Sequence, residues 1–323
     1  MEKNKYKKKI VITGGLGFIG SNYLNKFVLS QRQYLFINID AITYAANTKN
    51  ITVAKEPNYI FEKADIRRLS AIETVFEKYQ PTDIVHFAAE SHVDISIEKP
   101  ALFIETNIVG THNLLMTAKK YGIDRYYQVS TDEVYGSLKK GDKAFRTTSP
   151  LAPNSPYSAS KTSADLLVRA YHETFGLNTV ISRCSNNYGP NQDYTKLIPK
   201  FISLLLAGKK VPLYSKGENI RDWIYVEDHI DAIDHIFHKG KPGHIYNVGG
   251  NCEMTNKEIV SVLLKLTKRK ADAIEYVADR PGHDFRYAID TREIQKELGW
   301  RAKFDFKQGI EKTFEYYKKI DTK

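Results

Sequence analysis

A glycine-rich turn near the N-terminus constrains the fold of this chain more than any other feature. Gly14, Gly15, Gly17 and Gly20 follow an apolar run at residues 10–13 and lead into a helical pattern. The glycines permit a tight turn and let backbone N–H groups approach a pyrophosphate, and the helix N-terminus adds positive partial charge there. Strand, turn and helix in this order are typical of the first unit of a doubly wound α/β fold.

An acidic residue at a suitable distance supports dinucleotide binding. Asp40 follows Gly20 by twenty residues and ends the second apolar run. A carboxylate at this place accepts hydrogen bonds from an adenosine ribose and repels a 2′-phosphate. A glycine motif alone is weak evidence for dinucleotide binding, because an ordinary turn can contain glycines at the same spacing. Together with the strand, the helix and Asp40, it predicts a dinucleotide site and favours NAD over NADP.

Apolar runs and helical patterns alternate along the first part of the chain. Near-continuous Ile, Val, Phe and Tyr predict buried strands at residues 10–13, 35–40, 59–62, 83–88, 126–130 and 179–183. Apolar residues at three- and four-residue spacing predict helices at residues 22–30, 69–79, 104–121 and 158–175. This order indicates a parallel sheet with right-handed crossovers. We therefore predict a Rossmann-type, doubly wound α/β fold with a smaller mixed α/β C-terminal lobe.

The pattern changes after residue 185. Loops are expected at residues 186–191 and 214–219, strands at 224–226 and 245–248, and helices at 197–207, 260–266, 293–298 and 306–317. We expect residues 1–185, completed by about residues 222–250, to form an NAD-binding domain. Residues 186–221 and 251–323 are expected to form a lobe that binds the substrate.

Composition excludes several classes of protein. The 323 residues are 42% hydrophobic and 27% charged, which suits a packed core and not a disordered chain. No apolar stretch approaches the length of a membrane span, and the basic N-terminus lacks the apolar core of a signal peptide. Two cysteines exclude a disulfide framework, and no Cys/His spacing indicates a metal site. We expect a cytoplasmic protein without a metal.

The net charge of +10 points to an anionic partner. Most of the lysines are scattered along the chain, as on a solvated surface. A phosphorylated small molecule satisfies the same charge as a nucleic acid does. We expect binding to neither nucleic acid nor a membrane.

Tyr157 and Lys161 are four residues apart in a predicted helix, so a phenol and an ammonium project from one face. A nearby cation favours the phenolate and lowers the tyrosine pKa, which suits a group that takes a proton from a hydroxyl. The lysine can also hold the ribose beside a nicotinamide. The spacing alone fits surface packing as well, and its place behind the dinucleotide motif favours catalysis.

Three polar residues, Thr131, Asp132 and Glu133, follow the fifth predicted strand. An acidic turn after a strand is often only a turn. Two neighbouring carboxyls can also titrate as a coupled pair, in which one stays protonated and the other is ionised. Such a pair can supply an acid and a base at one place.

With these motifs in order, the chain resembles the extended short-chain dehydrogenase/reductase family and, within it, the nucleoside-diphosphate-sugar 4,6-dehydratases. The motifs that carry the resemblance are residues 88–94, 131–133, 155–161, 184–190, 221–229 and 279–284. The resemblance implies removal of water from a nucleoside-diphosphate glucose, with dTDP-glucose as the expected substrate. It also implies NAD that is regenerated in each turnover and stays tightly bound.

The resemblance implies a role for each catalytic residue. Tyr157, supported by Lys161, takes the proton of the C4 hydroxyl while hydride passes from C4 to NAD, and Thr131 hydrogen-bonds the C4 oxygen. Glu133 removes the C5 proton, and Asp132 protonates the departing C6 hydroxyl. Hydride then returns to C6.

Binding residues are implied in the same way. The expected cofactor residues are Gly14, Gly17, Phe18, Ile19, Gly20, Asp40, Thr43, Asp65, Ile66, Ala88, Ala89, Ser91, Thr106, Tyr157, Lys161 and Asn187. The expected substrate residues are Ser91, His92, Thr131, Asn186, Lys196, Leu197, Pro212, Tyr214, Arg221, Asn256, Arg280 and His283. The guanidinium groups of Arg221 and Arg280 can bind the phosphate oxygens of the substrate through two parallel hydrogen bonds. A single arginine is, however, more often a solvated surface residue. Asp65 has an alternative role as the N-cap of the following helix.

Several alternatives stay open. The same reaction on UDP-glucose is the nearest, because one methyl group in a pocket is worth only about 1–3 kcal/mol. A C4-epimerase needs the Tyr157/Lys161 pair but leaves Asp132 and Glu133 without a role. A non-catalytic NAD-binding scaffold needs none of these residues. The family is commonly homodimeric through two helices of each subunit, here residues 104–121 and 158–175, so a homodimer is expected.

Overall fold

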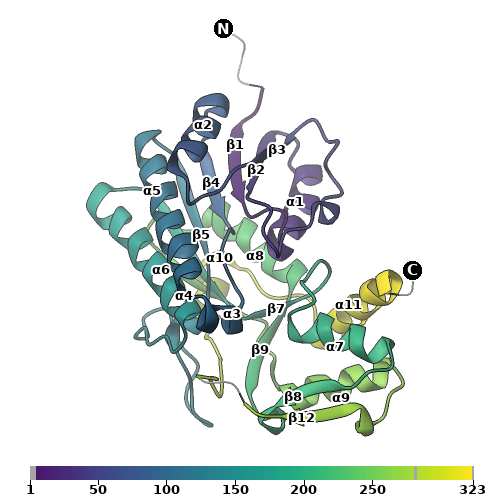
Figure 1. Ribbon diagram of the computed structural model, residues 1–323. Helices are drawn as coiled ribbons and strands as arrows, with labels where there is room; N and C mark the ends of the chain where they lie inside the picture. The colour runs from purple at the N-terminus through teal and green to yellow at the C-terminus, as the bar shows by residue number, and fades with distance from the viewer. Residues whose placement is uncertain (1–4, 280–281, 322–323) are drawn as a thin grey trace.

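A seven-stranded, fully parallel sheet forms the centre of the computed structural model, which describes residues 5–279 and 282–321 (Figure 1). The strands lie in the order β10-β6-β5-β4-β1-β2-β3. Their bounds are β1 Lys8–Thr13, β2 Tyr34–Asp40, β3 Tyr59–Lys63, β4 Asp83–His86, β5 Arg125–Thr131, β6 Thr179–Cys184 and β10 Ile245–Val248. The strand order reverses between β1 and β4, where doubly wound sheets bind their ligands. The fold class predicted from the sequence is confirmed.

Two helical layers cover this sheet because successive residues of a strand point to opposite faces. Ile10 and Ile12 of β1 pack into the core under α1 and α8, whereas Val11 between them packs into the core under α2, α5 and α6. Figure 1 shows the two layers on either side of the sheet. The helices are α1 Phe18–Ser30, α2 Leu69–Tyr79, α5 Gly110–Lys120, α6 Pro156–Phe175 and α8 Val226–Lys239.

The segment before α5 is also helical. It consists of α3 Val93–Glu98, α4 Pro100–Phe103 and the π-helical η2 Ile104–Val109. The helix expected at residues 104–121 therefore begins with a π-helical stretch.

A smaller lobe carries two further sheets, ordered β11-β9-β7 and β12-β8. Its strands are β7 Asn186–Tyr188, β8 Val211–Tyr214, β9 Ile220–Tyr225, β11 Glu253–Thr255 and β12 Ile274–Val277. Its helices are α7 Leu197–Leu206, α9 Asn256–Leu266 and α11 Phe306–Asp321, while α10 Arg292–Leu298 contacts β10 and α8 of the main sheet. Short 3-10 turns are η1 Thr48–Asn50, η3 Asp132–Tyr135, η4 Ser215–Gly217 and η5 Ala271–Ala273.

Several stretches of the small lobe and its surroundings differ from the sequence-based expectation, among them the strands β8, β11 and β12, which were not predicted. Residues 186–191 were expected as a loop, but Asn186–Tyr188 form β7 because they pair with β9. Residues 222–225, expected to complete the NAD-binding domain, belong to β9 of the small sheet. The helix α8 was not predicted, although it carries helix signals: acidic residues in its first turn and buried apolar residues at three-residue spacing, such as Ile230, Ile233 and Ile236. Among the described residues, no helix is long and apolar enough to cross a membrane.

Candidate active site

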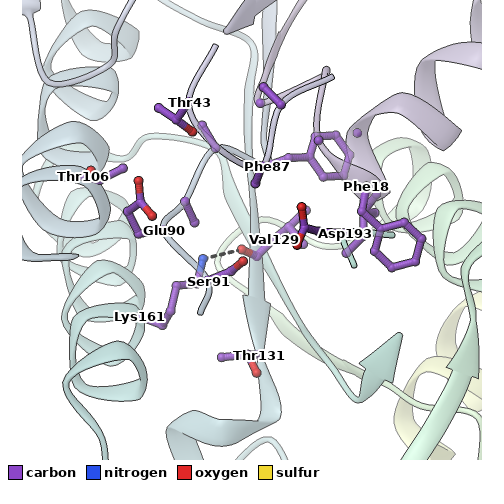
Figure 2. A pocket seen from close by; sticks show the side chains of 18 of the residues that line it. Phe18, Thr43, Phe87, Glu90, Ser91, Thr106, Val129, Thr131, Lys161 and Asp193 are labelled. Carbon is purple, nitrogen blue, oxygen red and sulfur yellow. Dashed lines mark hydrogen bonds between the residues drawn. The ribbon is translucent and has the colours of Figure 1, made fainter. Parts of the chain in front are cut away.

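A cavity of about 340 Å³ opens at the carboxyl ends of the central strands. The glycine turn after β1 forms one side of it, and the segments after β2, β3, β4, β5 and β6 form the others. All of the predicted cofactor residues and all five predicted catalytic residues line it. Figure 2 shows how side chains from these separate segments converge on the same space. The sequence motifs, distant along the chain, thus belong to one site.

The glycine turn fits tightly against the segment after β4. A Cβ atom on Gly14, whose φ is +71°, would lie 2.7 Å from the backbone of Ala88, and one on Gly20 would lie 2.6 Å from the carbonyl oxygen of Gly14. No side chain of the described residues caps the N-terminus of α1 at Gly17. The backbone N–H groups of this first turn are thus available to an anion, so the residues fit a bound dinucleotide.

Asp40 is fixed at the end of β2 by two backbone donors. Its carboxylate oxygens accept from the N–H groups of Leu16 at 3.0 Å and Ile42 at 2.8 Å. Burial raises the pKa of this carboxyl, and the two backbone hydrogen bonds oppose that effect. Each carboxylate oxygen has a second lone pair, so the group can also accept from ribose hydroxyls.

Asp65 does not cap α2, whose N-cap position is Arg68. Its carboxylate instead accepts from the Arg67 side chain, with 2.6 Å between Nη2 and Oδ2, and this interaction lowers the pKa of Asp65. The helix-cap alternative is therefore wrong. Asp65 and Arg67 both line the cavity as an ion pair.

The helix α6 places Tyr157 and Lys161 at the cavity. A capping box between Ser155 and Ser158 begins the helix, and Pro156 occupies its first turn. The Lys161 ammonium donates to the carbonyl oxygen of Val129 on β5 at 2.8 Å (Figure 2). Burial lowers the pKa of Lys161.

The expectation that Lys161 lowers the pKa of Tyr157 is not met. The pKa of Tyr157 is instead held well above its usual range, mainly by burial and secondly by the Glu133 carboxylate. A hydrogen bond with Thr131 acts in the opposite direction. The phenol is therefore the resting form in this arrangement, because desolvation of the phenolate outweighs the stabilising contacts.

The carboxyls of Asp132 and Glu133 have different environments. Both line the cavity, where Asp132 is buried and Glu133 is half-buried. Burial raises the pKa of Asp132 well above its usual range, Glu133 and Asp222 add to this effect, and Arg221 opposes it. The raised pKa favours the neutral form of Asp132, and such a group next to a more exposed carboxyl has the arrangement expected of an acid and a base.

Four of the predicted substrate residues, Ser91, Thr131, Asn186 and Lys196, line the cavity. The Lys196 ammonium donates to the carbonyl oxygen of Ser91 at 2.7 Å and so joins the small lobe to the segment after β4. Arg280 lies outside the described residues. The remaining predicted residues do not line this cavity: His92, Leu197, Pro212, Tyr214, Arg221, Asn256 and His283.

Among the residues outside this cavity, Arg221 is fixed by several contacts within the small lobe. Its buried guanidinium donates to the carbonyl oxygens of Ile220 at 2.7 Å and Asp284 at 2.9 Å, and it lies 4.3 Å from the ring centroid of Tyr287. These contacts hold the segment around Asp284 against β9. Tyr214 and His283 do meet in the small lobe, with 6.1 Å between their ring centroids.

Sequence reasoning missed several residues of the cavity wall. These are Ile39, Ala41, Ala45, Ala46, Ala64, Arg67, Phe87, Glu90, Leu102, Val129, Ser130, Cys184, Ser185, Gln192 and Asp193. Glu90 directly follows the predicted Ala88 and Ala89, so that motif already contained the signal for it. The Cys184 thiol lies beside the catalytic residues, and burial raises its pKa to about 12, which argues against a nucleophilic role.

A Rossmann-type sheet, a glycine turn facing an acid, and a Tyr157/Lys161 helix at the same cavity define the class of short-chain dehydrogenase/reductase-like enzymes that act through a bound dinucleotide. The family model described as GDP-mannose 4,6 dehydratase matches residues 11–313. The chain belongs to this family, which confirms the prediction of a nucleoside-diphosphate-sugar dehydratase relative.

Individual relatives agree with this assignment. The dTDP-glucose 4,6-dehydratase of Haemophilus influenzae is 46% identical, over 95% of this chain and 97% of that protein. The solved structure of the Bacillus anthracis dTDP-glucose 4,6-dehydratase in complex with NAD is 45% identical, with a TM-score of 0.91 and 98% of each chain covered. The NAD complex of Thermus thermophilus UDP-glucose 4-epimerase is 28% identical, with a TM-score of 0.89, and covers 96% of this chain and 99% of that one.

Proposed function

We propose that this protein is an NAD-dependent hydro-lyase that converts dTDP-glucose to dTDP-4-keto-6-deoxyglucose. The observation that carries the proposal is the Asp132/Glu133 pair in one cavity with Tyr157 and Lys161, where the pKa of Asp132 is raised. The relatives at 46% and 45% identity, both named dTDP-glucose 4,6-dehydratases, support this substrate.

The residues of α6 and β5 carry out the oxidation at C4. Bound NAD supplies the uptake of hydride from C4 and its later return to C6. Tyr157 takes the proton of the C4 hydroxyl, and Thr131 hydrogen-bonds the same oxygen. Because the pKa of Tyr157 is high, its phenolate forms only at a cost, which the hydrogen bond with Thr131 reduces. In this proposal the buried Lys161 cation supports the same proton transfer once substrate and NAD are bound.

The residues of η3 carry out the loss of water. The C4 ketone acidifies the C5 hydrogen, which Glu133 removes as a proton. Asp132, kept neutral by burial and by its acidic neighbours, protonates the C6 hydroxyl as it leaves. One water departs, and a proton returns to C5 when C6 receives hydride. The atoms balance without any further reactant.

The competing functions make less use of the site. A C4-epimerase function is consistent with the similarity to the Thermus thermophilus enzyme. However, that reaction leaves the buried acid Asp132 without a catalytic role. A non-catalytic scaffold leaves the whole catalytic set without a purpose. The UDP-glucose reaction uses the same residues, so that only the base pocket distinguishes it.

The test is to incubate the purified protein separately with dTDP-glucose and UDP-glucose, first without and then with added NAD. Mass spectrometry measures the loss of one water from each sugar nucleotide. Faster loss from dTDP-glucose without added NAD is the expected result. No loss from either substrate in the presence of NAD contradicts the proposal.

The predicted site residues form part of the same proposal. The residues that line the cavity from the glycine turn to Asn187 hold NAD, and Ser91, Asn186 and Lys196 face the sugar nucleotide. The main domain thus binds the cofactor. The small lobe, with Tyr214, Asn256 and His283, receives the nucleotide end of the substrate.

We further propose a homodimer formed by the helices of residues 104–121 and α6. These helices expose large apolar side chains, with Met116 39%, Leu166 53% and Phe175 48% accessible to solvent. Apolar groups exposed on neighbouring helices are typical of a protein–protein contact. A cytoplasmic location and a place in deoxysugar biosynthesis complete the proposal and rest on the resemblance to the family.

A further inference from the structure

A chain of buried polar side chains runs behind the cavity, and the proposed chemistry does not use it. Arg183 donates from Nε to Asp165 Oδ2 at 2.9 Å and from Nη1 to the Tyr135 hydroxyl at 3.0 Å. The Tyr135 hydroxyl in turn donates to Oδ1 of Asn247 at 2.8 Å. All four residues are almost completely buried, with at most 3% of each exposed. The chain therefore joins α6, β6, η3 and β10 in the protein interior.

Two members of this chain, Asp165 and Tyr135, belong to the two elements that carry the catalytic residues. Asp165 follows Lys161 by four residues on α6, so it lies one turn further along the helix that carries Tyr157. Tyr135 ends the 3-10 turn η3 that begins with Asp132 and Glu133. The helix of the oxidation and the turn of the water loss are thus connected through Arg183.

We infer that Asp165, Arg183 and Tyr135 are positioning residues that hold the Asp132/Glu133 pair in register with Tyr157 and Lys161. The inference rests on the proposed dehydratase function and assigns no contact with the substrate to these three residues. Their task is to keep the base above C5 and the acid at the C6 hydroxyl, while Tyr157 acts at C4.

The 3-10 turn η3 needs such support because it is only four residues long. Thr131 holds its first end by accepting from the N–H of Glu133 at 3.3 Å. Gly136, with φ of +87°, closes its second end, where a Cβ atom would lie 2.3 Å from the carbonyl oxygen of Ala152. Between these ends, Val134 and Tyr135 are both buried, and the Tyr135 hydroxyl provides a polar anchor in the interior.

The ring of Tyr135 is held as firmly as its hydroxyl. It stacks on Phe145 with 5.1 Å between ring centroids, and the Arg183 guanidinium carbon lies 4.8 Å from its centroid. The Asn247 amide continues the chain by donating to the carbonyl oxygen of Phe145 at 3.0 Å. Loss of the hydroxyl alone therefore leaves the ring packed and removes only the polar connection.

A contribution to stability explains the buried Asp165–Arg183 ion pair less well than a positioning role does. Buried ion pairs are often replaceable by apolar residues of similar volume with no loss of stability, whereas their directional hydrogen bonds fix geometry. Asp165 also opposes the effect of burial on the pKa of Lys161, so its charge favours the ammonium form of the catalytic lysine. Both effects serve the relative placement and charge of the catalytic groups.

The test uses Tyr135→Phe with Tyr246→Phe as the matched control. Tyr246 is equally buried, and its hydroxyl also has two partners, the N–H of Lys241 at 3.1 Å and Glu297 at 3.2 Å. It lies next to Asn247 on β10 but outside the polar chain. Each variant is assayed as the NAD-bound protein in a single turnover of dTDP-glucose. Absorbance reports the reduced cofactor, quenched mass spectrometry reports the loss of water, and thermal unfolding reports Tm.

We expect Tyr135→Phe to slow the loss of water about ten- to hundredfold, since small misplacements of catalytic groups have effects of this size. Oxidation at C4 should change much less, so the reduced cofactor accumulates, whereas Tyr246→Phe behaves as wild type. Asp165→Asn keeps the volume of the side chain and removes its charge. This variant should also slow the loss of water more than the oxidation at C4.

Three outcomes overturn the inference. A Tyr135→Phe protein with wild-type water loss shows that the hydroxyl positions nothing. Equal slowing of oxidation and water loss, together with a lower Tm, shows a purely structural role. A wild-type protein that oxidises neither dTDP-glucose nor UDP-glucose overturns the proposed function itself, and this inference with it, so the two failures are distinguishable.

Discussion

The Nζ atom of Lys161 lies 2.8 Å from the carbonyl oxygen of Val129 and donates a hydrogen bond to it. This contact ties α6 to β5 two residues before Thr131, so the strand that leads into the acidic turn also holds the catalytic cation. The ammonium is buried, and its pKa is lowered by that burial. Its charge therefore acts in surroundings that screen it little.

Lys161→Met should reduce kcat by a factor of about 10²–10⁴, the range for loss of assistance to proton transfer. The methionine keeps the length of the side chain but removes the buried cation of α6, to which the proposed mechanism assigns support of proton transfer to Tyr157. Steady-state assay of water loss measures the effect. Lys78→Met serves as the control, because the Lys78 side chain is 59% exposed and pairs only with surface groups. Equal activity of the two variants would contradict the role of Lys161.

Glu133→Gln should abolish water loss and leave the protein able to bind NAD. The amide keeps the shape of the side chain but cannot accept the C5 proton. Oxidation at C4 does not need this group, so the absorbance of the reduced cofactor should rise after dTDP-glucose is added and persist. Unchanged turnover would refute the role of Glu133 as the base.

Asp132→Asn should inactivate the protein and stabilise it at neutral pH by about 1–3 kcal/mol, the size of a buried group's desolvation penalty. The pKa of Asp132 is raised above the ordinary value of 3.8. The unfolded chain ionises this carboxyl near pH 3.8, whereas the folded protein ionises it only at higher pH. The free energy of unfolding of the native protein therefore falls as the pH rises from 3.8 through the raised pKa, and the asparagine variant has no such loss. Urea unfolding of both proteins across this pH range measures the difference. A gain that is largest at low pH would contradict the assignment.

Asp40→Ser should weaken NAD binding about ten- to hundredfold, the equivalent of a lost hydrogen bond to a charged group. It should also improve binding of NADP, because the carboxylate no longer repels a 2′-phosphate. Calorimetric titration of the cofactor-stripped protein with both dinucleotides measures the change. Asp124→Ser is the control, because Asp124 is exposed and lies away from the cavity. An unchanged ratio of the two affinities would show that Asp40 does not select the cofactor.

Leu166→Glu should convert the proposed dimer to single chains. Leu166 is 53% exposed on α6, and a charge there would be buried in the proposed contact. Light scattering at micromolar concentration measures the mass. Leu29→Glu, at a side chain 46% exposed on α1 in the opposite helical layer, should leave the dimer intact. A wild-type mass equal to that of one chain would rule out the dimer.

Local patterns made much of this site predictable. The glycine turn and Asp40 belong to one strand–helix–strand unit, and Tyr157 and Lys161 lie one turn apart on one helix. Such features depend only on the neighbouring residues of the chain, so spacing reveals them. The strand β7 was missed for the opposite reason, since polar residues such as Asn186 and Asn187 become a strand only by pairing with β9.

By itself, the sequence determined the alternation of strands and helices up to residue 185, the dinucleotide turn and the kinds of catalytic groups present, because each follows from a short local pattern. Only the tertiary structure decided the protonation preferences of those groups. The raised pKa of Asp132 depends on burial and on Asp222, which lies far along the chain. The polar chain from Asp165 to Tyr135 likewise joins residues that no local pattern relates. Desolvation and long-range contacts exist only after the chain has folded.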